Sequence, residues 1–245
     1  MHDLPLIGPP PRQAQLQRDP GSSAPQARSR HERIATVAAD ELEVVDGISV
    51  STVARALVDF ARAETLRAAV VAADAALRRG LARSDLLEVA SRCAAWPNGL
   101  QGLWVARFAD GLAESALESM SRVACHELGL PAPELQIEVF HGEQLVARVD
   151  HLWRATNTIG QSDGAVKYDS RADVLRDKHQ DEQLESLGFE VVRWGWDQAY
   201  RPRGVLDARL ERGFVRGARQ QIDPRVRLVT ATIAQNLAKN ARWAG

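Results

Sequence analysis

Four side chains in the middle of the sequence have the types and spacing that could handle a divalent cation: Glu118, Asp150, Gln161 and Asp163. Residues 161 and 163 differ by two, so in a strand their side chains point to the same face. Asp150 and Gln161 are 11 residues apart, and a short hairpin turn would bring them together on adjacent strands. Because an unpaired buried carboxylate is costly, acids placed in this way need a reason.

A magnesium ion would supply that reason. Mg²⁺ takes oxygen ligands, usually one or two carboxylates, with water and substrate phosphate in the remaining positions. Such an ion polarises a phosphodiester and generates hydroxide from bound water. Lys167, four residues after Asp163, could add positive charge near the developing phosphorane or orient the water. The other reading of Asp150 is a strand-end carboxylate that pairs with Arg148 or Arg154.

The elements that must position these residues follow in the order α-β-β-β-α-β. The spacing of apolar residues predicts a helix over 114–128, strands over 135–140, 145–153 and 158–163, a helix over 173–187 and a strand over 189–194. This order is typical of a small mixed sheet flanked by helices, an α/β architecture. Arg193 on the last, apolar strand favours a buried ion pair with Asp150 or Asp163.

The residues before this region are predicted to be mostly helical. Residues 1–31 contain six prolines and are typical of a loop-rich or flexible leader. Two short strands follow over 34–40 and 42–50, with Gly47 at a turn, and then amphipathic helices to about residue 108. The expected domains are a leader (1–31), a short hairpin with a helical region (32–112), a sheet domain (113–200) and a basic helical tail (201–245). Arg55 and Asp59, four residues apart, are expected to pair on a helix surface.

Composition limits the class of protein. The 245 residues carry a net charge of −1, contain no apolar run near the roughly 20 residues that span a bilayer, and include two cysteines that suit a reducing compartment. We therefore expect a cytoplasmic protein with no membrane contact. No Gly-rich phosphate loop or CxxC pair is present, so no small-molecule cofactor is expected.

The charge is unevenly distributed along the chain. Residues 201–245 hold nine arginines and one lysine against three acids, a net +7, so the first 200 residues carry −8. A basic segment on an acidic body suits contact with a phosphate backbone, and arginines on a solvated helix face explain the same charges.

Residues 113–198 resemble the very-short-patch-repair (Vsr)-like endonuclease domain, a branch of the PD-(D/E)xK nuclease superfamily. The segments that carry the likeness are ESALES, GLPAPELQ, ARVDHLW, IGQSDG and LESLGFEVVRW. The resemblance implies a restriction-endonuclease-like sheet. Residue by residue, Glu118 matches the helix acid, Asp150 the principal metal ligand, Asp163 the second acid of the E-x-D-G motif and Arg193 the arginine of the last strand.

The same resemblance implies a function. It indicates a Mg²⁺-dependent DNA endonuclease or nickase, with metal on Asp150, Glu118 and Asp163, and DNA contacts from Arg193, Arg201 and Arg203. Such domains recur in bacterial proteins of unknown function, often behind abortive-infection-type antitoxin regions. LPLIGPPP and ISVSTVARALVDFAR are similar to the linker of longer relatives, so the chain looks shortened at its N-terminus.

One position departs from the family motif. Gln161 stands where E-x-D-G has Glu, and an amide keeps one oxygen ligand but loses the negative charge. Two further hypotheses therefore remain open. One is a catalytically degenerate module that binds DNA or a protein, and the other is a structural or regulatory subunit of a toxin–antitoxin or phage-defence system.

Overall fold

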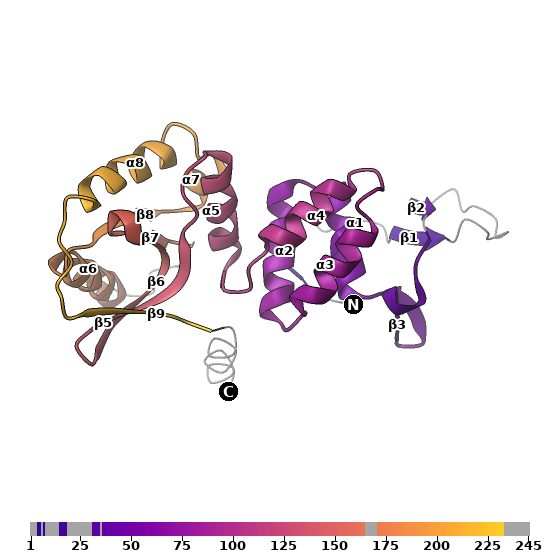
Figure 1. Ribbon diagram of the computed structural model, residues 1–245, viewed down its shortest axis with the longest axis horizontal. Coiled ribbons are helices and arrows are strands. Elements are labelled where there is room, and N and C mark those ends of the chain that lie inside the picture. The colour runs from indigo at the N-terminus through magenta and orange to yellow at the C-terminus, as the bar shows by residue number, and fades with distance from the viewer. Residues whose placement is uncertain are drawn as a thin grey trace. The chain divides into compact units, whose positions relative to one another are not determined.

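The computed structural model describes residues 4–5, 7, 15–18, 31–34, 36–164 and 171–232, and for residues 15–18, 31–34 and 171–177 it describes the backbone alone. The chain forms two compact units, Met1–Ala109 and Asp110–Gly245 (Figure 1). The first unit combines short strands with four helices, and the second is built around a sheet. The expected mixed α/β fold, with a mostly helical region and a short hairpin before the sheet, is confirmed.

The strands of the first unit form two small pairs. A parallel pair joins β1 (Gln15–Arg18) to β2 (His31–Ile34), so part of the segment expected to be a leader is a strand. A single 3₁₀ turn, η1 (Ala39–Glu41), then leads into an antiparallel hairpin of β3 (Leu42–Val45) and β4 (Ile48–Ser51).

The hairpin is formed by different segments of the chain from the expected ones. It lies entirely within residues 42–51 instead of joining 34–40 to 42–50. Asp46 and Gly47 supply its two-residue turn with φ angles of 51° and 79°. An Asp-Gly pair with positive φ at both positions gives the backbone twist that a tight hairpin requires. Gly47 therefore lies in a turn, as expected, but that turn joins two four-residue strands within the segment that was expected to be a single strand.

Four helices complete the first unit: α1 (Val53–Ala63), α2 (Leu66–Arg78), α3 (Arg83–Arg92) and α4 (Gly99–Phe108). The side-chain oxygens of Thr52 and Thr65 accept from backbone N–H groups at the start of α1 and α2, which satisfies donors that a helix leaves unpaired. Ten consecutive residues of α2, from Ala68 to Leu77, are buried. Small alanine side chains there allow the neighbouring helices to approach closely.

The Arg55–Asp59 pair expected on a helix surface is formed, but it is buried. The Arg55 guanidinium is 0% exposed, and its Nε donates to Asp59 at 2.9 Å. Its Nη1 donates to Glu41 at 2.5 Å, and Glu41 is itself only 3% exposed. Arg55 therefore links α1 to the turn before the hairpin, a partnership that the helical spacing alone could not reveal.

In the described part of the second unit there are four helices and five strands. Its elements in chain order are α5 (Ala116–Glu127), β5 (Glu134–His141), β6 (Gln144–Trp153), the 3₁₀ turn η2 (Arg154–Thr156), β7 (Thr158–Ser162), α6 (Arg171–Ser186), β8 (Glu190–Trp194), α7 (Trp196–Tyr200), α8 (Leu206–Gly217) and β9 (Val226–Thr230). The order from α5 to β8 is the one that the sequence predicts.

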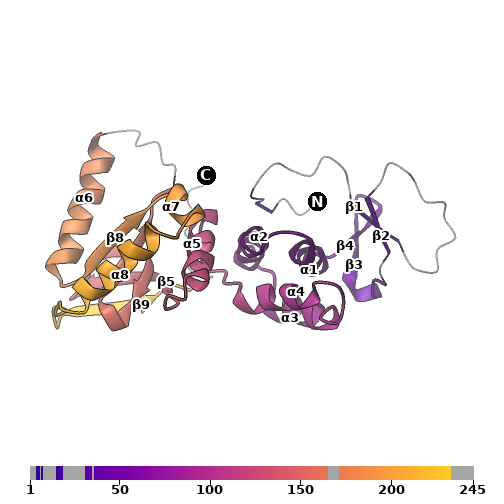
Figure 2. The ribbon, with the colours of Figure 1, turned by 90° about the horizontal axis from the view of Figure 1, so that it is seen from above.

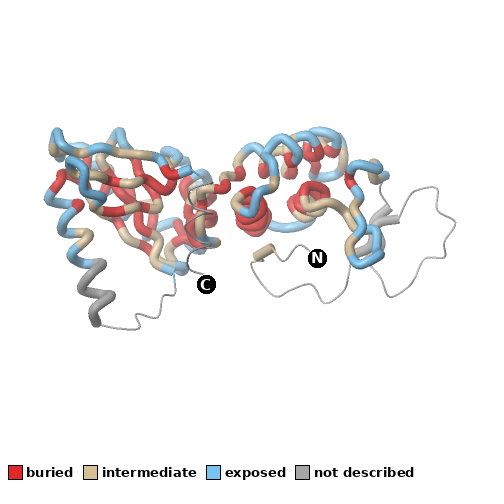
Figure 3. Tube along the Cα trace, turned by 90° about the horizontal axis from the view of Figure 1, so that it is seen from below, coloured by how far each residue is buried: buried red, intermediate tan, exposed pale blue. Residues whose placement is uncertain are grey.

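The five strands form one mixed sheet in the order β8-β7-β6-β5-β9. Only the β7–β8 pair is parallel, with Gln161 opposite Arg193, and the other pairs are antiparallel. Helix α6 contributes Leu184 to one apolar core, whereas α5, α7 and α8 pack with Trp153 and Trp194 in another. Helices therefore cover both faces, and the buried residues of the strands lie between them (Figures 2 and 3).

The segment expected to be a basic helical tail is part of this sheet unit. Helix α8 packs its buried residues Leu206 and Leu210 in the core with Trp153 and Trp194. Strand β9 pairs antiparallel with β5 and forms an edge of the sheet. The prediction of helices after residue 201 missed this strand, because VRLVT is only five residues long and Arg227 is its one charged residue.

No helix in the part of the chain that the structure describes is long and apolar enough to cross a membrane.

Candidate functional site

Helix α5 places the first acid of the site. The Ser115 side chain accepts from the Glu118 backbone N–H at 3.1 Å and so caps the start of the helix. Glu118 is therefore in the first turn, where the helix dipole favours a negative side chain. Its Oε2 accepts from the Glu114 backbone N–H at 2.7 Å and from Gln136 Nε2 at 2.9 Å. These two donors fix the carboxyl group above the sheet residue Gln136.

Glu118 is an unusual acid because it is only 5% exposed. Burial raises the pKa of its carboxyl, and the negative charge of Asp150 raises it further, to about 7. The hydrogen bonds from Glu114, Ser115 and Gln136 oppose the shift but do not cancel it. The two carboxylates from α5 and β6 are therefore close enough to repel each other.

Asp150 on β6 is held by the neighbouring strand. Its Oδ2 accepts from the backbone N–H of Ser162 at 2.8 Å and from Ser162 Oγ at 2.9 Å. The Asp150 N–H faces Gln161 Oε1 at 3.4 Å, which is the proximity expected from the hairpin spacing. Arg148 pairs with Glu114 at 2.6 Å and Arg154 with Glu134 at 2.6 Å. A serine and backbone groups, rather than a strand arginine, thus orient the Asp150 carboxylate.

His151 lies beside Asp150 in the chain but belongs to the aromatic core. It is 0% exposed, with ring centroids 5.3 Å from Trp194 and 6.2 Å from Trp153. Neither ring nitrogen has a hydrogen-bond partner among the described residues. Burial lowers the pKa of His151, against the opposing effect of Asp150. The ring therefore packs as a neutral group in the aromatic core. Opposite it on β7, Gly160 leaves room for this core, because an added Cβ would lie 2.4 Å from the Trp194 ring.

Asp163 is not joined to the other acids. Its Oδ1 accepts from Arg193 Nη1 at 2.5 Å, and Arg193 Nε also donates to Asp181 of α6 at 2.7 Å. This ion pair between Arg193 and Asp163 was one of the two expected from the sequence. Arg193 thus lies between the carboxylates of Asp163 and Asp181, and Asp163 holds this arginine in place.

The remaining predicted site residues have varied outcomes. Lys167 lies outside the described residues. Arg201 and Arg203 are exposed and follow α7. Gln161 is 8% exposed and uses its amide oxygen towards the Asp150 N–H. The site therefore brings together Glu118, Asp150 and Gln161.

A three-residue metal group is not formed by the expected acids. Among the described residues, no three side chains of His, Cys, Asp or Glu lie together in a way that could hold a metal ion. The expected trio does not form because Asp163 pairs with Arg193 instead. Glu118 and Asp150 remain as two carboxylates, and Oδ1 of Asp150 accepts no hydrogen bond from the described residues. Two hard oxygen ligands are within the range that Mg²⁺ accepts when water and phosphate complete its shell.

The sequence analysis missed two residues that shape the site. Gln136 is 2% exposed, adopts a positive φ of 51° and donates to Glu118. Ser162 binds the Asp150 carboxylate twice. A signal for Ser162 was available, because it lies between the two singled-out residues 161 and 163. Nothing in the local pattern marks Gln136, since its backbone conformation depends on the surrounding strands.

Comparison with curated proteins finds two relatives from Mycobacterium tuberculosis, the uncharacterized protein MT2308 of strain CDC 1551 / Oshkosh and the uncharacterized protein Rv2248 of strain ATCC 25618 / H37Rv. Each is 34% identical over 188 residues, which cover 74% of this chain and 66% of the relative. The chain thus spans just under two thirds of the length of these relatives. No profile of a known protein family matches the sequence, and no solved structure matches it.

Proposed function

We propose that the sheet unit is a Vsr-like, restriction-endonuclease-like domain that hydrolyses DNA phosphodiesters with Mg²⁺ bound by Asp150 and Glu118. The observation that carries the proposal is the convergence of these two carboxylates from α5 and β6. Burial raises the pKa of Glu118, and the charge of Asp150 raises it further, to about 7. A divalent cation relieves the repulsion between such a pair. The resemblance over residues 113–198 favours the same two residues.

The chain's own groups would divide the work. Ser162 holds Asp150 Oδ2 and leaves Oδ1 to bind an ion or its water. Without an ion, burial and the charge of Asp150 raise the pKa of Glu118 to about 7, so Glu118 would release its proton on binding Mg²⁺ near neutral pH. When bound, Mg²⁺ would polarise the phosphodiester and acidify a coordinated water. The two free, buried cysteines suit the reducing cytoplasm, where we propose that the protein acts.

A second candidate function is a degenerate module that binds DNA, or a protein partner in a toxin–antitoxin or phage-defence system, without cutting. One observation favours it. The Gln161 oxygen faces the Asp150 N–H, and Asp163 is paired with Arg193, so neither adds a ligand beside Glu118 and Asp150. A two-carboxylate site binds a hard cation less tightly than a three-carboxylate one.

Conversion of supercoiled plasmid to nicked circles in Mg²⁺ or Mn²⁺ distinguishes the two functions. We expect the wild type to nick DNA and Asp150→Asn, which keeps the shape of the side chain, to lose at least 100-fold in rate. Gln161→Glu should cut at least as fast as the wild type. If only Gln161→Glu cuts, the chain is a disarmed nuclease scaffold and the catalytic proposal is wrong.

A further inference from the structure

A groove lined by arginines lies between α8 and β8. Its walls are Arg209, Arg212 and Arg216 of α8, and Val191, Val192 and Arg193 of β8. Because β8 is an edge strand of the sheet, the groove follows one border of the second unit. Four of the six residues that line the groove are arginines, and the other two are valines.

Helical periodicity explains why the arginines gather there. Residues 209, 212 and 216 are three and four positions apart, so they form one row along α8. At 100° per residue, the two acids of the helix, Asp207 and Glu211, point away from this row. Asp207 instead accepts from the backbone N–H groups of Gly204 and Ala208 at the helix start. Charge is thus segregated around the helix.

The charges in the groove are only partly compensated. Arg216 donates to Glu190 at 2.8 Å, and Arg193 is held by Asp163 and Asp181. Arg209 donates to the backbone carbonyl of Arg193 at 2.9 Å, a contact that fixes its position without neutralising it. Neither Arg209 nor Arg212 pairs with a carboxylate among the described residues, and both are exposed. Two guanidinium groups are therefore available to an anion.

We propose that the α8–β8 groove binds the phosphate backbone of nucleic acid without regard to sequence. Guanidinium groups bind phosphate through paired N–H donors. The lining contains no aromatic side chain on which a base could stack, so backbone contacts are expected to dominate.

The choice of ligand rests on the proposed function, because Arg193 in the groove lies opposite Gln161 in the β7–β8 pair. A strand bound in the groove would therefore run beside β7, which carries Gln161 and lies between the groove and Asp150 of β6.

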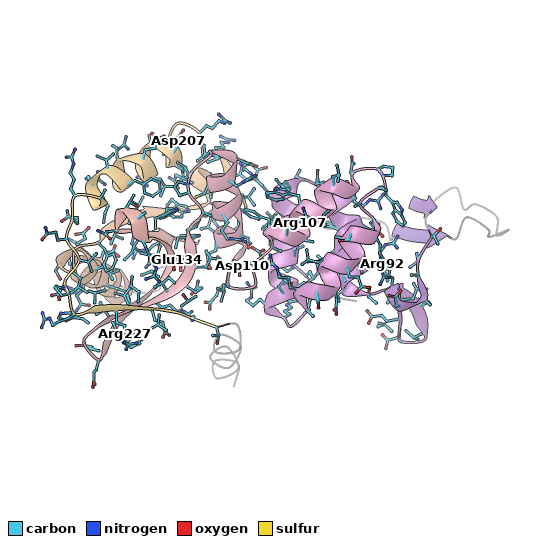
Figure 4. The ribbon with its side chains drawn as sticks, in the orientation of Figure 1. Arg92, Arg107, Asp110, Glu134, Asp207 and Arg227 are labelled. Carbon is cyan, nitrogen blue, oxygen red and sulfur yellow. The ribbon has the colours of Figure 1, made fainter. Side chains whose placement is uncertain are left out.

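Fluorescence anisotropy of a labelled duplex, measured in EDTA at several salt concentrations, tests the groove separately from catalysis. The variant is Arg209→Gln with Arg212→Gln. The matched control, Arg225→Gln with Arg227→Gln, removes the same charge at the opposite edge, where β9 lies. Figure 4 shows Arg227 beside β9, away from Asp207 of α8.

We expect the groove variant to bind at least tenfold more weakly than the control. The slope of log K against log salt should become shallower by about 2, because each lost phosphate contact contributes roughly 0.9. Equal affinities for the two variants, no binding by the wild type, or equally tight binding of polyglutamate would overturn the proposal. Binding that persists when Asp150→Asn and wild type both fail to nick plasmid would remove the catalytic function but keep the groove.

Discussion

Glu118 and Asp150 are the residues on which the chemistry depends. Glu118 is buried under the start of α5, with its charge opposed by burial and by Asp150. Asp150 is held by two donors from Ser162. The position of Glu118 does not favour its ionised form, since a buried carboxyl with a raised pKa favours its neutral form. An acid kept in such a place is a candidate for a functional role.

The raised pKa of Glu118 predicts how stability depends on pH. Between the ordinary pKa of 4.5 and the folded value of about 7, the folded state binds more protons than the unfolded state. The free energy of unfolding of the metal-free second unit should therefore fall as pH rises through this window. Urea unfolding in EDTA at pH 4.5 to 8, followed by hydrogen exchange of β5 to β8, measures the effect.

Glu118→Gln is the control for this pH dependence. It keeps the size of the side chain and removes the titration, so its stability should vary less across the same window. An identical decline in Glu118→Gln and wild type would show that another group is responsible.

At the scale of single residues, the sequence allowed part of the site to be predicted. The proximity of Asp150 to Gln161 followed from strand periodicity and a short turn, and the structure has it. For Asp163, the sequence left two partners of Arg193 open, Asp150 and Asp163, and the structure pairs Arg193 with Asp163. Its partner Arg193 is 30 residues away, and Asp181, which holds the same arginine, comes from α6. Ion pairs between distant elements depend on the assembled fold, which local patterns do not contain.

At the scale of elements, α5 and the strands β5 to β8 could be predicted because their apolar periods are clear. Helix α6 is mostly polar, with little apolar periodicity, and was placed by its position before Gly188. The hairpin of β3 and β4 and the edge strand β9 could not be bounded as well. Both are short, and their pairing is decided by a two-residue turn or by an open neighbouring strand. In β9, the alternation of Arg227 with apolar residues is the pattern of a strand with one solvated face.

The contact between α1 and the turn before the hairpin yields a prediction for the first unit. Arg55→Ala leaves Glu41 buried and Asp59 without its Nε donor. Removing one partner of a buried ion pair costs roughly 3–5 kcal/mol of unfolding free energy.

Glu88→Ala is the comparison. Glu88 is exposed and pairs with Arg92 at the i,i+4 spacing, and such surface ion pairs contribute little to stability. Urea denaturation followed by hydrogen exchange of α1 to α4 measures both variants. Equal losses of stability would contradict the burial of the Arg55 pair.

At the scale of the whole molecule, the chain combines two compact units with an uneven charge distribution. The basic residues between 201 and 232 do not form a separate tail, because α8 and β9 belong to the sheet unit. Their charge is therefore carried on a fixed surface, which is what a groove for a phosphate backbone requires. The groove borders β8, and β7 separates that strand from β6, which carries Asp150 of the candidate cation site.

The joining of Asp150 and Glu118 into a cation site is tested most directly by thermal melting during a Mg²⁺ titration. An ion that binds the folded state raises the melting temperature by mass action, through RT ln(1 + [L]/Kd). We predict a rise with Mg²⁺ for the wild type that is steeper at pH 8 than at pH 6, and no rise for Asp150→Asn. Equal responses of the two proteins, or no response of the wild type, would contradict a cation site at these carboxylates.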